Sequence, residues 1–365
     1  MKSFLFIITL FFSSINLLSS QEIDLTDRLQ QILDKDVADG QFAGCVAGIA
    51  VGEKEIVVAA GYRDVKSETS FERVTLNRIA SISKSMTAVA ALQLYEQGLL
   101  DLDEPIATYL PAYPKQHASR ITTRHLLLHS SGIGAYKSGK ETESEKEYAS
   151  LTEAATVFQD RELVDEPGNA EHYSTYGYVV LGMVIEAVSG QTYEDYMEEH
   201  IWAAAGMENT GVEHLNENYE NKSSFYRRTK RGKVRLSDTN NLSNRVPGGG
   251  IYSTVDDLLK FGKAVLDHRL INEDTFAMMM EEPDLAYDGN PYGMGWFLYG
   301  ENPNLGQVYG HTGEQTGCAT VLLLMPEKDT VMVVMSNTAH SLQHVFGIAV
   351  RHMFPLVKEI NDTQK

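Results

Sequence analysis

Strand-like apolar runs lie at both ends of this chain, with a long helical stretch between them. Near the N-terminus, Cys45–Val51 and Ile56–Tyr62 are joined by Gly52-Glu53-Lys54-Glu55, a pattern that predicts a β-hairpin. Three more strand-like runs lie near the C-terminus: Gly295–Leu298, Ala319–Met325 and Thr330–Ser336. Because strands must share a sheet to pair their backbone groups and bury their apolar faces, these distant runs are predicted to form one antiparallel sheet.

Residues from about 100 to 255 lack sustained strand alternation and show helical spacing instead. Gly190 and Gly206 mark the ends of two of these helices. The charged stretch Lys137–Tyr148 is interpreted as a surface loop. The helices predicted in this region are Arg124–His129, Leu151–Gln159, Tyr176–Val188 and Tyr193–Ala205. Further helices are predicted at Thr26–Val37, Ser81–Gln97, Thr254–Leu266 and Leu342–Phe354. The order of strands, helices, strands and helix indicates an α+β protein with a helical insertion.

The first twenty residues differ in kind from the rest. Lys2 precedes the apolar run Phe4–Phe12, and the small residues Ser19 and Ser20 come just before a polar stretch. This pattern is typical of a secretory signal peptide, so residues 1–20 are predicted to be removed and the mature protein to be secreted or periplasmic. An uncleaved anchor is the alternative. We expect no stable membrane association after cleavage, since no other run is long enough to span a bilayer.

The charge balance bears on possible partners. The 365 residues carry a formal net charge of −19, and no basic stripe stands out to neutralise phosphates, so nucleic acid is not expected as a partner. The dense basic patch is Arg227–Lys233, which we interpret as a solvated hairpin or loop, with a partner site as the alternative. The sequence leaves the oligomeric state open.

The two cysteines, Cys45 and Cys318, each open an apolar strand-like run. In an exported chain they could form a bridge, but the pattern equally suits two buried thiols. We favour free thiols, and neither cysteine stands in a metal-ligand pattern. The pairs His125/His129 and His340/His344 have helical spacing without a third ligand nearby, so we expect no metal and no cofactor.

The tetrad Ser81-Ile82-Ser83-Lys84 lies at the start of a strongly helical run. A Ser and a Lys three residues apart on a helix share one face, one turn apart. A Lys amine kept neutral by burial can take the proton of a Ser hydroxyl, which is otherwise a poor nucleophile. The tetrad alone is a weak signal, because about one Ser-x-x-Lys is expected by chance at this composition.

Four further motifs follow the tetrad in a consistent order. They are Leu126–Gly132; Glu166-Pro167-Gly168 with Tyr173–Tyr178; Gly248–Leu258; and Tyr292–Trp296 with Gly310-His311-Thr312-Gly313. Together with Ser81–Lys84 they resemble the serine beta-lactamase family of the class C type, which includes DD-carboxypeptidases, D-aminopeptidases and related esterases. The resemblance extends from about Leu29 to Phe354.

The resemblance implies a fold with an antiparallel β-sheet flanked by helices and an inserted all-helical domain. On this basis residues 21–90 and 255–365 are predicted to form the sheet domain and residues 91–254 the helical domain. The active site is expected in the cleft between the two.

The resemblance also implies roles for individual residues. Ser81 matches the nucleophile, Lys84 its activating partner, and Tyr173 the residue that shuttles the proton to the leaving group. His311 opens the motif in which many relatives carry Lys, and Thr312 and Gly313 would lie along the strand edge where substrate binds. The backbone amides of Ser81 and Glu314 match the oxyanion hole. A tyrosine acts as a base only if nearby cations lower its pKa, and Lys84 and His311 are the candidate cations.

One residue departs from the family pattern. Relatives usually carry Asn where this chain has Thr175. The Thr hydroxyl is shorter than the Asn carboxamide and lacks its separate N–H donor and carbonyl acceptor. We therefore expect an exported serine hydrolase that forms an acyl-enzyme on an amide or ester of a small molecule or peptide, most plausibly a D-amino-acid peptide. A small-ester carboxylesterase and a true beta-lactamase are the alternatives among enzymes. The alternative of another class is a catalytically silent peptidoglycan-binding or sensor domain.

Overall fold

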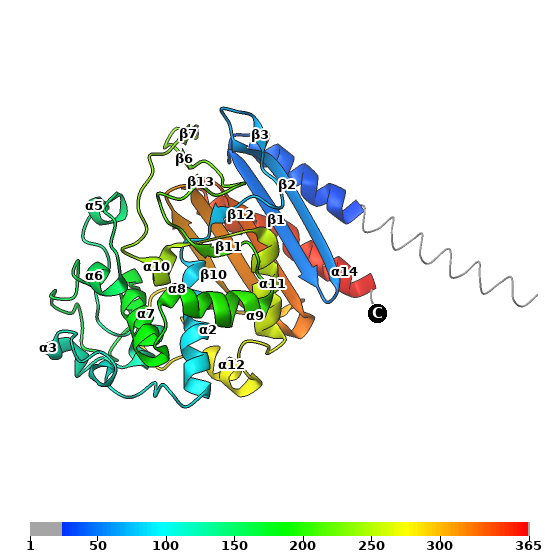
Figure 1. Cartoon of the computed structure of the whole chain (residues 1–365). Coiled ribbons are helices and arrows are strands. Elements are labelled where there is room, and N and C mark those ends of the chain that lie inside the picture. Colours follow the sequence, from blue (N-terminus) through cyan, green and yellow to red (C-terminus); the bar gives the residue numbers. More distant parts are fainter. Residues whose placement is uncertain (1–23, 364–365) are drawn as a thin grey trace, which may run out of the picture.

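A seven-stranded antiparallel sheet forms the centre of the protein, in a computed structural model that describes residues 24–363 (Figure 1). The strand order is β3-β2-β1-β12-β11-β10-β9. The pairing of β1 with β12, from Cys45 opposite Ser336 to Val51 opposite Thr330, joins the two ends of the chain. The strands are β1 Gly44–Val51, β2 Lys54–Asp64, β3 Thr69–Ser70, β9 Phe297–Asn302, β10 Gly306–Gln315, β11 Cys318–Met325 and β12 Thr330–Ser336. The predicted sheet is thus confirmed, while the predicted signal peptide lies outside the described residues.

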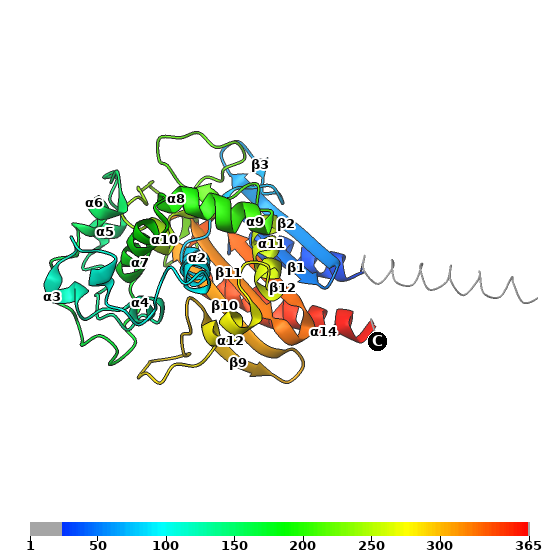
Figure 2. The ribbon, with the colours of Figure 1, turned by 60° about the horizontal axis from the view of Figure 1, so that its bottom comes forward.

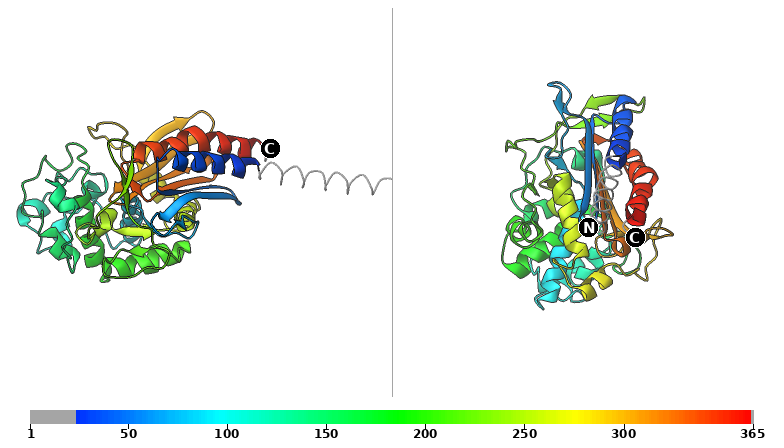
Figure 3. Two further views of the ribbon diagram at one scale, coloured as in Figure 1. Left: turned by 90° about the horizontal axis from the view of Figure 1, so that it is seen from above. Right: turned by 90° about the vertical axis from the view of Figure 1, so that its right-hand side faces the viewer.

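Helices cover both faces of the sheet (Figure 3). The helix over residues 24–38 and the C-terminal helix α14 (Phe354–Thr363) lie on one face, and α11 (Val255–Leu266) lies on the other. Along β1, Cys45 and Ala47 belong to the first of these core layers and Val46 to the second, as the two-residue period of a strand requires. Every residue of β1 is buried for this reason.

The helix α2 (Ile82–Glu96) runs between the sheet and the remaining helices (Figure 2). Most of its residues are buried, which is why its sequence is apolar and small nearly all round. Around it lie α3 Lys115–Ala118, α4 Thr123–Leu127, α5 Gly139–Thr142, α6 Leu151–Ala155, α7 Thr175–Ser189, α8 Tyr193–Tyr196, α9 Ala203–Ala205, α10 Val246–Gly249 and α12 Glu273–Met279. The helix α13 (Leu342–Ile348) continues through a π-helical turn into α14.

Two small sheets connect the helical region to the strands that flank the active site. One has the order β13-β6-β7, with β13 Thr338–Ala339, β6 Tyr226–Arg228 and β7 Val234–Leu236. The other has the order β4-β8-β5, with β4 Asn77–Arg78, β8 Ile251–Ser253 and β5 Gly211–Val212. The β6–β7 pair confirms the interpretation of Arg227–Lys233 as a hairpin or loop. The other short strands were not predicted, because two or three residues are too short to show alternation.

Other details differ from the sequence-based expectations. The predicted loop Lys137–Tyr148 contains the short helix α5, and the last helix continues past Phe354 to Thr363. The strand β10 was not predicted from the pattern, because its three glycines interrupt the apolar alternation. The division into a sheet domain and a helical domain at residues 90 and 254 stays a prediction.

Cys45 and Cys318 are free and buried, which confirms the preference for thiols. Cys45 lies opposite Ser336, and Ser336 lies opposite Ala319, the neighbour of Cys318. Two strand spacings, roughly 9–10 Å, exceed the Cα separation that a disulfide can bridge. Burial raises the pKa of Cys318 to about 12, so this thiol is unreactive at neutral pH.

Among the described residues, we find no helix both long and apolar enough to cross a membrane.

Candidate active site

Ser81 is the N-cap residue of α2, and Lys84 lies in the first turn. The Nζ of Lys84 is 3.0 Å from the Oγ of Ser81. The turn before the helix places Ala80 at φ +48°, a conformation that is rare for a residue with a side chain. Such strain concentrates at functional sites, and here it sets the direction in which Ser81 enters the helix. The spacing predicted from sequence is therefore realised as a direct contact.

Lys84 is fully buried and makes no ion pair with any described residue. Its Nζ contacts the Oγ1 of Thr175 at 3.2 Å and the backbone oxygen of Gly248 at 2.7 Å. Burial lowers the pKa of Lys84 well below its usual value, and the nearby charge of Arg245 lowers it further. Both effects favour the neutral form of the amine that lies next to the Ser81 hydroxyl.

Tyr173 lies just before α7, and its ring centroid is 4.9 Å from the Nζ of Lys84. Its ring also contacts that of His129, with 4.2 Å between the centroids. Burial raises the pKa of Tyr173 strongly, although a hydrogen bond with Ser81 opposes the shift. The condition under which Tyr173 would act as a base, a pKa lowered by nearby cations, is therefore not met. Tyr173 keeps its proton at neutral pH, while 37% of its surface stays accessible.

His311 lies on β10 and is completely buried. Its Nδ1 is 2.6 Å from the backbone oxygen of Thr312, and its Nε2 is 3.0 Å from the hydroxyl of Tyr292. Burial lowers the pKa of His311 to about 3, helped by the proximity of Lys84. A neutral ring donates from Nδ1 to the Thr312 oxygen and accepts the Tyr292 hydroxyl at Nε2, so His311 is not a cation acting on Tyr173.

The segment after His311 brings β10 against the start of α2. A side chain on Gly313 would place its Cβ 2.4 Å from the backbone oxygen of Ile79, so only glycine allows this approach. Thr312 precedes it on the strand, and the carboxylate of Glu314 accepts hydrogen bonds from the backbone amides of Ser341 and Leu342. The Glu314 side chain is thus turned to α13.

A cavity of about 600 Å³ opens beside Ser81. Thr175 and Glu314 line it together with Ser81, so three of the predicted residues share one space. Tyr173 and His311 lie outside this lining. Further walls come from the β6–β7 hairpin, the segment that leads into α10, α10 itself and the end of β10. They include Arg227, Asn240, Arg245, Gly249, Gln315 and Thr316.

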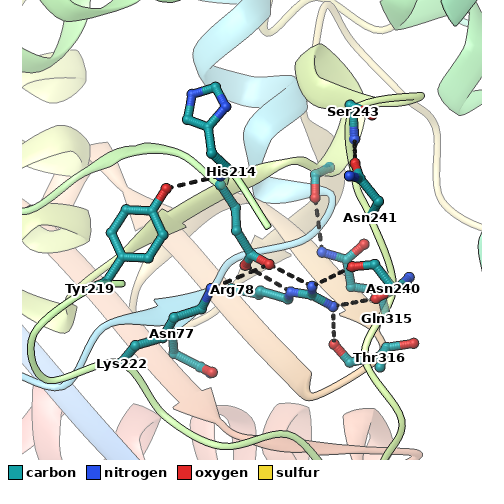
Figure 4. A network of polar contacts seen from close by, with 12 residues as sticks. Asn77, Arg78, His214, Tyr219, Lys222, Asn240, Asn241, Ser243, Gln315 and Thr316 are labelled. Carbon is teal, nitrogen blue, oxygen red and sulfur yellow. Dashed lines mark hydrogen bonds and ion pairs between the residues drawn. The ribbon is translucent and has the colours of Figure 1, made fainter. Parts of the chain in front are cut away.

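A buried network supports the cavity wall (Figure 4). Arg78 is fully buried and its Nη2 is 2.6 Å from the Oε1 of Glu213. The same guanidinium donates to Asn240 and to the backbone oxygen of Thr316. The network therefore joins β4, three residues before Ser81, to the segment that follows β10.

Two further residues shape this site: Gly248, which the sequence analysis placed in a motif without a role, and Arg245, which it missed. Gly248, in the glycine turn, supplies the backbone oxygen that holds Lys84. Arg245, three residues earlier, is 3% exposed and donates to neutral acceptors only, namely Asn244 and the backbone oxygens of Glu141 and Thr142. Its position before a motif was the available signal, but nothing local distinguishes it from a surface arginine.

Comparisons with known proteins show the family of this chain. Residues 29–351 match the model of the Beta-lactamase family, and the chain belongs to this family. The human serine beta-lactamase-like protein LACTB, mitochondrial, is 30% identical, with 83% of this chain and 71% of that protein covered. The protein is accordingly a serine hydrolase of the beta-lactamase and penicillin-binding-protein type.

Solved structures give the same result. D-amino acid amidase from Ochrobactrum anthropi SV3, complexed with D-phenylalanine, matches with a TM-score of 0.80 and 26% identity over 94% of this chain and 100% of that chain. The penicillin binding protein from Bacillus halodurans matches with a TM-score of 0.74 and 25% identity over 86% and 97%. The predicted fold class is confirmed.

Proposed function

We propose that the protein hydrolyses amide or ester bonds through an acyl-enzyme on Ser81, with Lys84 as the base. The observation that carries this proposal is the buried, unpaired Lys84 amine 3.0 Å from the Ser81 hydroxyl. A neutral amine has two N–H donors and one lone pair. Donation to Gly248 and Thr175 uses both donors, which leaves the lone pair for the proton of Ser81.

The reaction begins when Lys84 takes the Ser81 proton as the Oγ bonds to the carbonyl carbon. The negative charge then resides on the carbonyl oxygen. We propose that the backbone amides of Ser81 and Glu314 donate hydrogen bonds to this oxygen. The bond to the leaving group breaks next. Tyr173 gives its proton to the leaving group and recovers one from the Lys84 ammonium, so the amine is neutral again.

Water completes the cycle by the reverse route. Its oxygen bonds to the acyl carbon, its proton passes to Lys84, and the bond to Ser81 breaks as the Oγ takes that proton back. The raised pKa of Tyr173 suits a residue that is protonated in the resting enzyme and acts as a proton donor. In this account His311 is a neutral support for Tyr292 on the β10 side of the site.

The proposed substrate is a peptide or amide of a D-amino acid. The support comes from the family and from structural neighbours named as D-amino acid amidase and D-stereospecific amidohydrolase. Thr175 favours this substrate class over beta-lactams, because its hydroxyl contacts Lys84 and has no second end for a substrate amide. A small-ester carboxylesterase is the second candidate, and a silent binding domain has no need of the Lys84 arrangement.

Hydrolysis assays test the function directly. We expect D-phenylalanine amide to be cleaved with a higher kcat/KM than L-phenylalanine amide, with Ser81→Ala as the inactive control. Equal rates on both amides together with faster cleavage of a p-nitrophenyl ester would support the esterase instead. Export is part of the proposal, and the mass of the protein recovered from an expression host tests removal of residues 1–20.

A further inference from the structure

The β6–β7 hairpin carries a concentration of positive charge that is unusual for this chain. Six of the 31 Lys and Arg residues lie in the eleven residues from 226 to 236, which contain no acidic residue, although the chain has a net charge of −19. The six are Arg227, Arg228, Lys230, Arg231, Lys233 and Arg235. Five are exposed, and none of the six forms an ion pair with a described residue.

The hairpin keeps these charges close together at a cost in stability. Arg227 lies directly opposite Arg235 in the strand register, and like charges in such a pair repel each other. The Nε of Arg228 is buried without a hydrogen-bond partner. An anion bound beside Arg227 and Arg235 would offset the repulsion between them.

The cationic side chains are not needed to form the turn. Backbone bonds close it, from the Thr229 amide to the Lys233 oxygen and from the Gly232 amide to the Thr229 oxygen, and Gly232 adopts φ +74°. The hairpin is held in place by parallel pairing of Tyr226 with Thr338 and by the Tyr226 hydroxyl, which accepts from the Val65 amide. The charges are therefore carried on a supported scaffold and are available to a ligand.

This scaffold borders the active site. Arg227 lines the same cavity as Ser81, and so do Ser237 and Asp238, which directly follow β7. The buried guanidinium of Arg245 lines that cavity too and forms no ion pair with a carboxylate among residues 24–363. Glu143, Glu145, Asp238 and Glu314 line the same cavity, so the excess of positive charge lies on the hairpin at the cavity rim.

We propose that the β6–β7 hairpin binds an anionic segment of the substrate and holds the scissile bond over Ser81. The substrate would be a peptide with several carboxylates at a distance from the bond that is cut. This inference rests on the proposed function and adds the substrate's charge to it. The position at the cavity rim favours such a peptide over a lipid surface, because a bound chain continues into the cavity.

The test compares two labelled peptides with the same D-residue bond and leaving group, one with three remote Glu residues and one with three Gln. We expect kcat/KM for the acidic peptide to be at least about 10-fold higher at low ionic strength, with the preference lost in about 0.5 M NaCl. In K230Q/R231Q/K233Q the preference should fall to about one. K54Q/K115Q/K358Q removes three lysines elsewhere and should keep it.

The outcomes separate the two proposals. Cleavage of both peptides at equal rates by the unaltered protein would overturn this inference and leave the proposed function intact. If neither peptide is cleaved, the proposed function fails. Fluorescence anisotropy then measures the binding of the two peptides to the Ser81→Ala protein. Tighter binding of the acidic peptide would support the inference, and equal binding would overturn it. Hairpin-dependent binding to vesicles of anionic phospholipid without any peptide preference would also overturn it.

Discussion

The Lys84 amine lies 3.0 Å from the Ser81 hydroxyl at the start of α2, and no carboxylate in the described part of the chain forms an ion pair with this amine. Most buried lysines are paired with an acid, since burial of an isolated charge is costly. Here burial shifts the pKa of the amine toward the neutral form, which lowers this cost and is the form that a base requires. The stability of the site and its reactivity thus have the same physical origin.

Arg245 should control the pH at which this base becomes active. A nearby cation disfavours the protonated form of Lys84, so Arg245→Gln should raise the Lys84 pKa. Because the neutral amine is the active form, the acidic limb of the kcat/KM profile should move to higher pH. Arg245→Lys keeps the charge and should keep the limb near its original place. An unmoved limb in Arg245→Gln, with activity retained, would show that Arg245 only supports Glu141 and Thr142.

Tyr173 should be needed for proton transfer to the leaving group. Tyr173→Phe keeps the ring contact with His129 and removes the hydroxyl, so kcat should fall by about 10²–10⁴-fold. The loss should be larger for an amide than for a p-nitrophenyl ester, whose leaving group needs no proton. Steady-state rates on both substrates measure it. Near-normal turnover of the amide would rule out the relay.

Thr175 should set the balance between peptides and beta-lactams. Each missing polar contact costs about 1–3 kcal/mol, so nitrocefin should be a poorer substrate than an activated ester or a D-Ala peptide. Thr175→Asn restores a two-ended amide and should raise kcat/KM for nitrocefin relative to the ester by about 10-fold. Thr175→Ser is the matched control that retains a hydroxyl. A nitrocefin value far above the others in the unaltered protein would identify a true beta-lactamase.

The Arg78–Glu213 pair should matter for stability. Arg78→Met leaves the buried carboxylate of Glu213 with Lys222 as its remaining cationic partner. We expect the free energy of unfolding to fall by about 3–5 kcal/mol. Burial raises the pKa of Glu213, but Arg78 and then Lys222 lower it more, so the net shift is downward. The Glu213 carboxylate therefore binds a proton more readily in the unfolded chain than in the folded one. The stabilisation that the Arg78–Glu213 pair gives is fully present above the ordinary pKa of Glu, and it is lost as the pH falls from there through the lowered pKa of the folded protein. Urea unfolding of Arg78→Met and Glu213→Gln at pH 7 and pH 4 measures both effects, and equal losses at the two pH values would contradict the linkage.

Local patterns predicted much of this structure. Ser81 and Lys84 could be placed together from sequence because three residues on a helix fix their relation. The helix over 24–38 and the strands β1, β2, β11 and β12 were predicted because their apolar periods are regular. The joining of the two chain ends followed from the need of each strand for a partner.

What the sequence did not predict depends on contacts between distant segments. The low pKa of His311 comes from complete burial and from the proximity of Lys84, and no pattern around position 311 indicates either. Arg245 acts on Lys84 from 161 positions away in the sequence, a relation that only the folded chain creates. The same holds for Glu213, which meets Arg78 across 135 positions.

Peptide mapping of a trapped acyl or phosphonyl adduct tests the central claim most directly. After exposure to a fluorophosphonate, the mass of one adduct should be found on Ser81, and Ser81→Ala should take up none. The neighbouring hydroxyls are poor competitors, because Ser83 donates to the Ala80 oxygen and Ser85 to the Gly295 oxygen within the interior. An adduct on Ser83 or Ser85, or an unlabelled protein that still hydrolyses its substrate, would contradict the account.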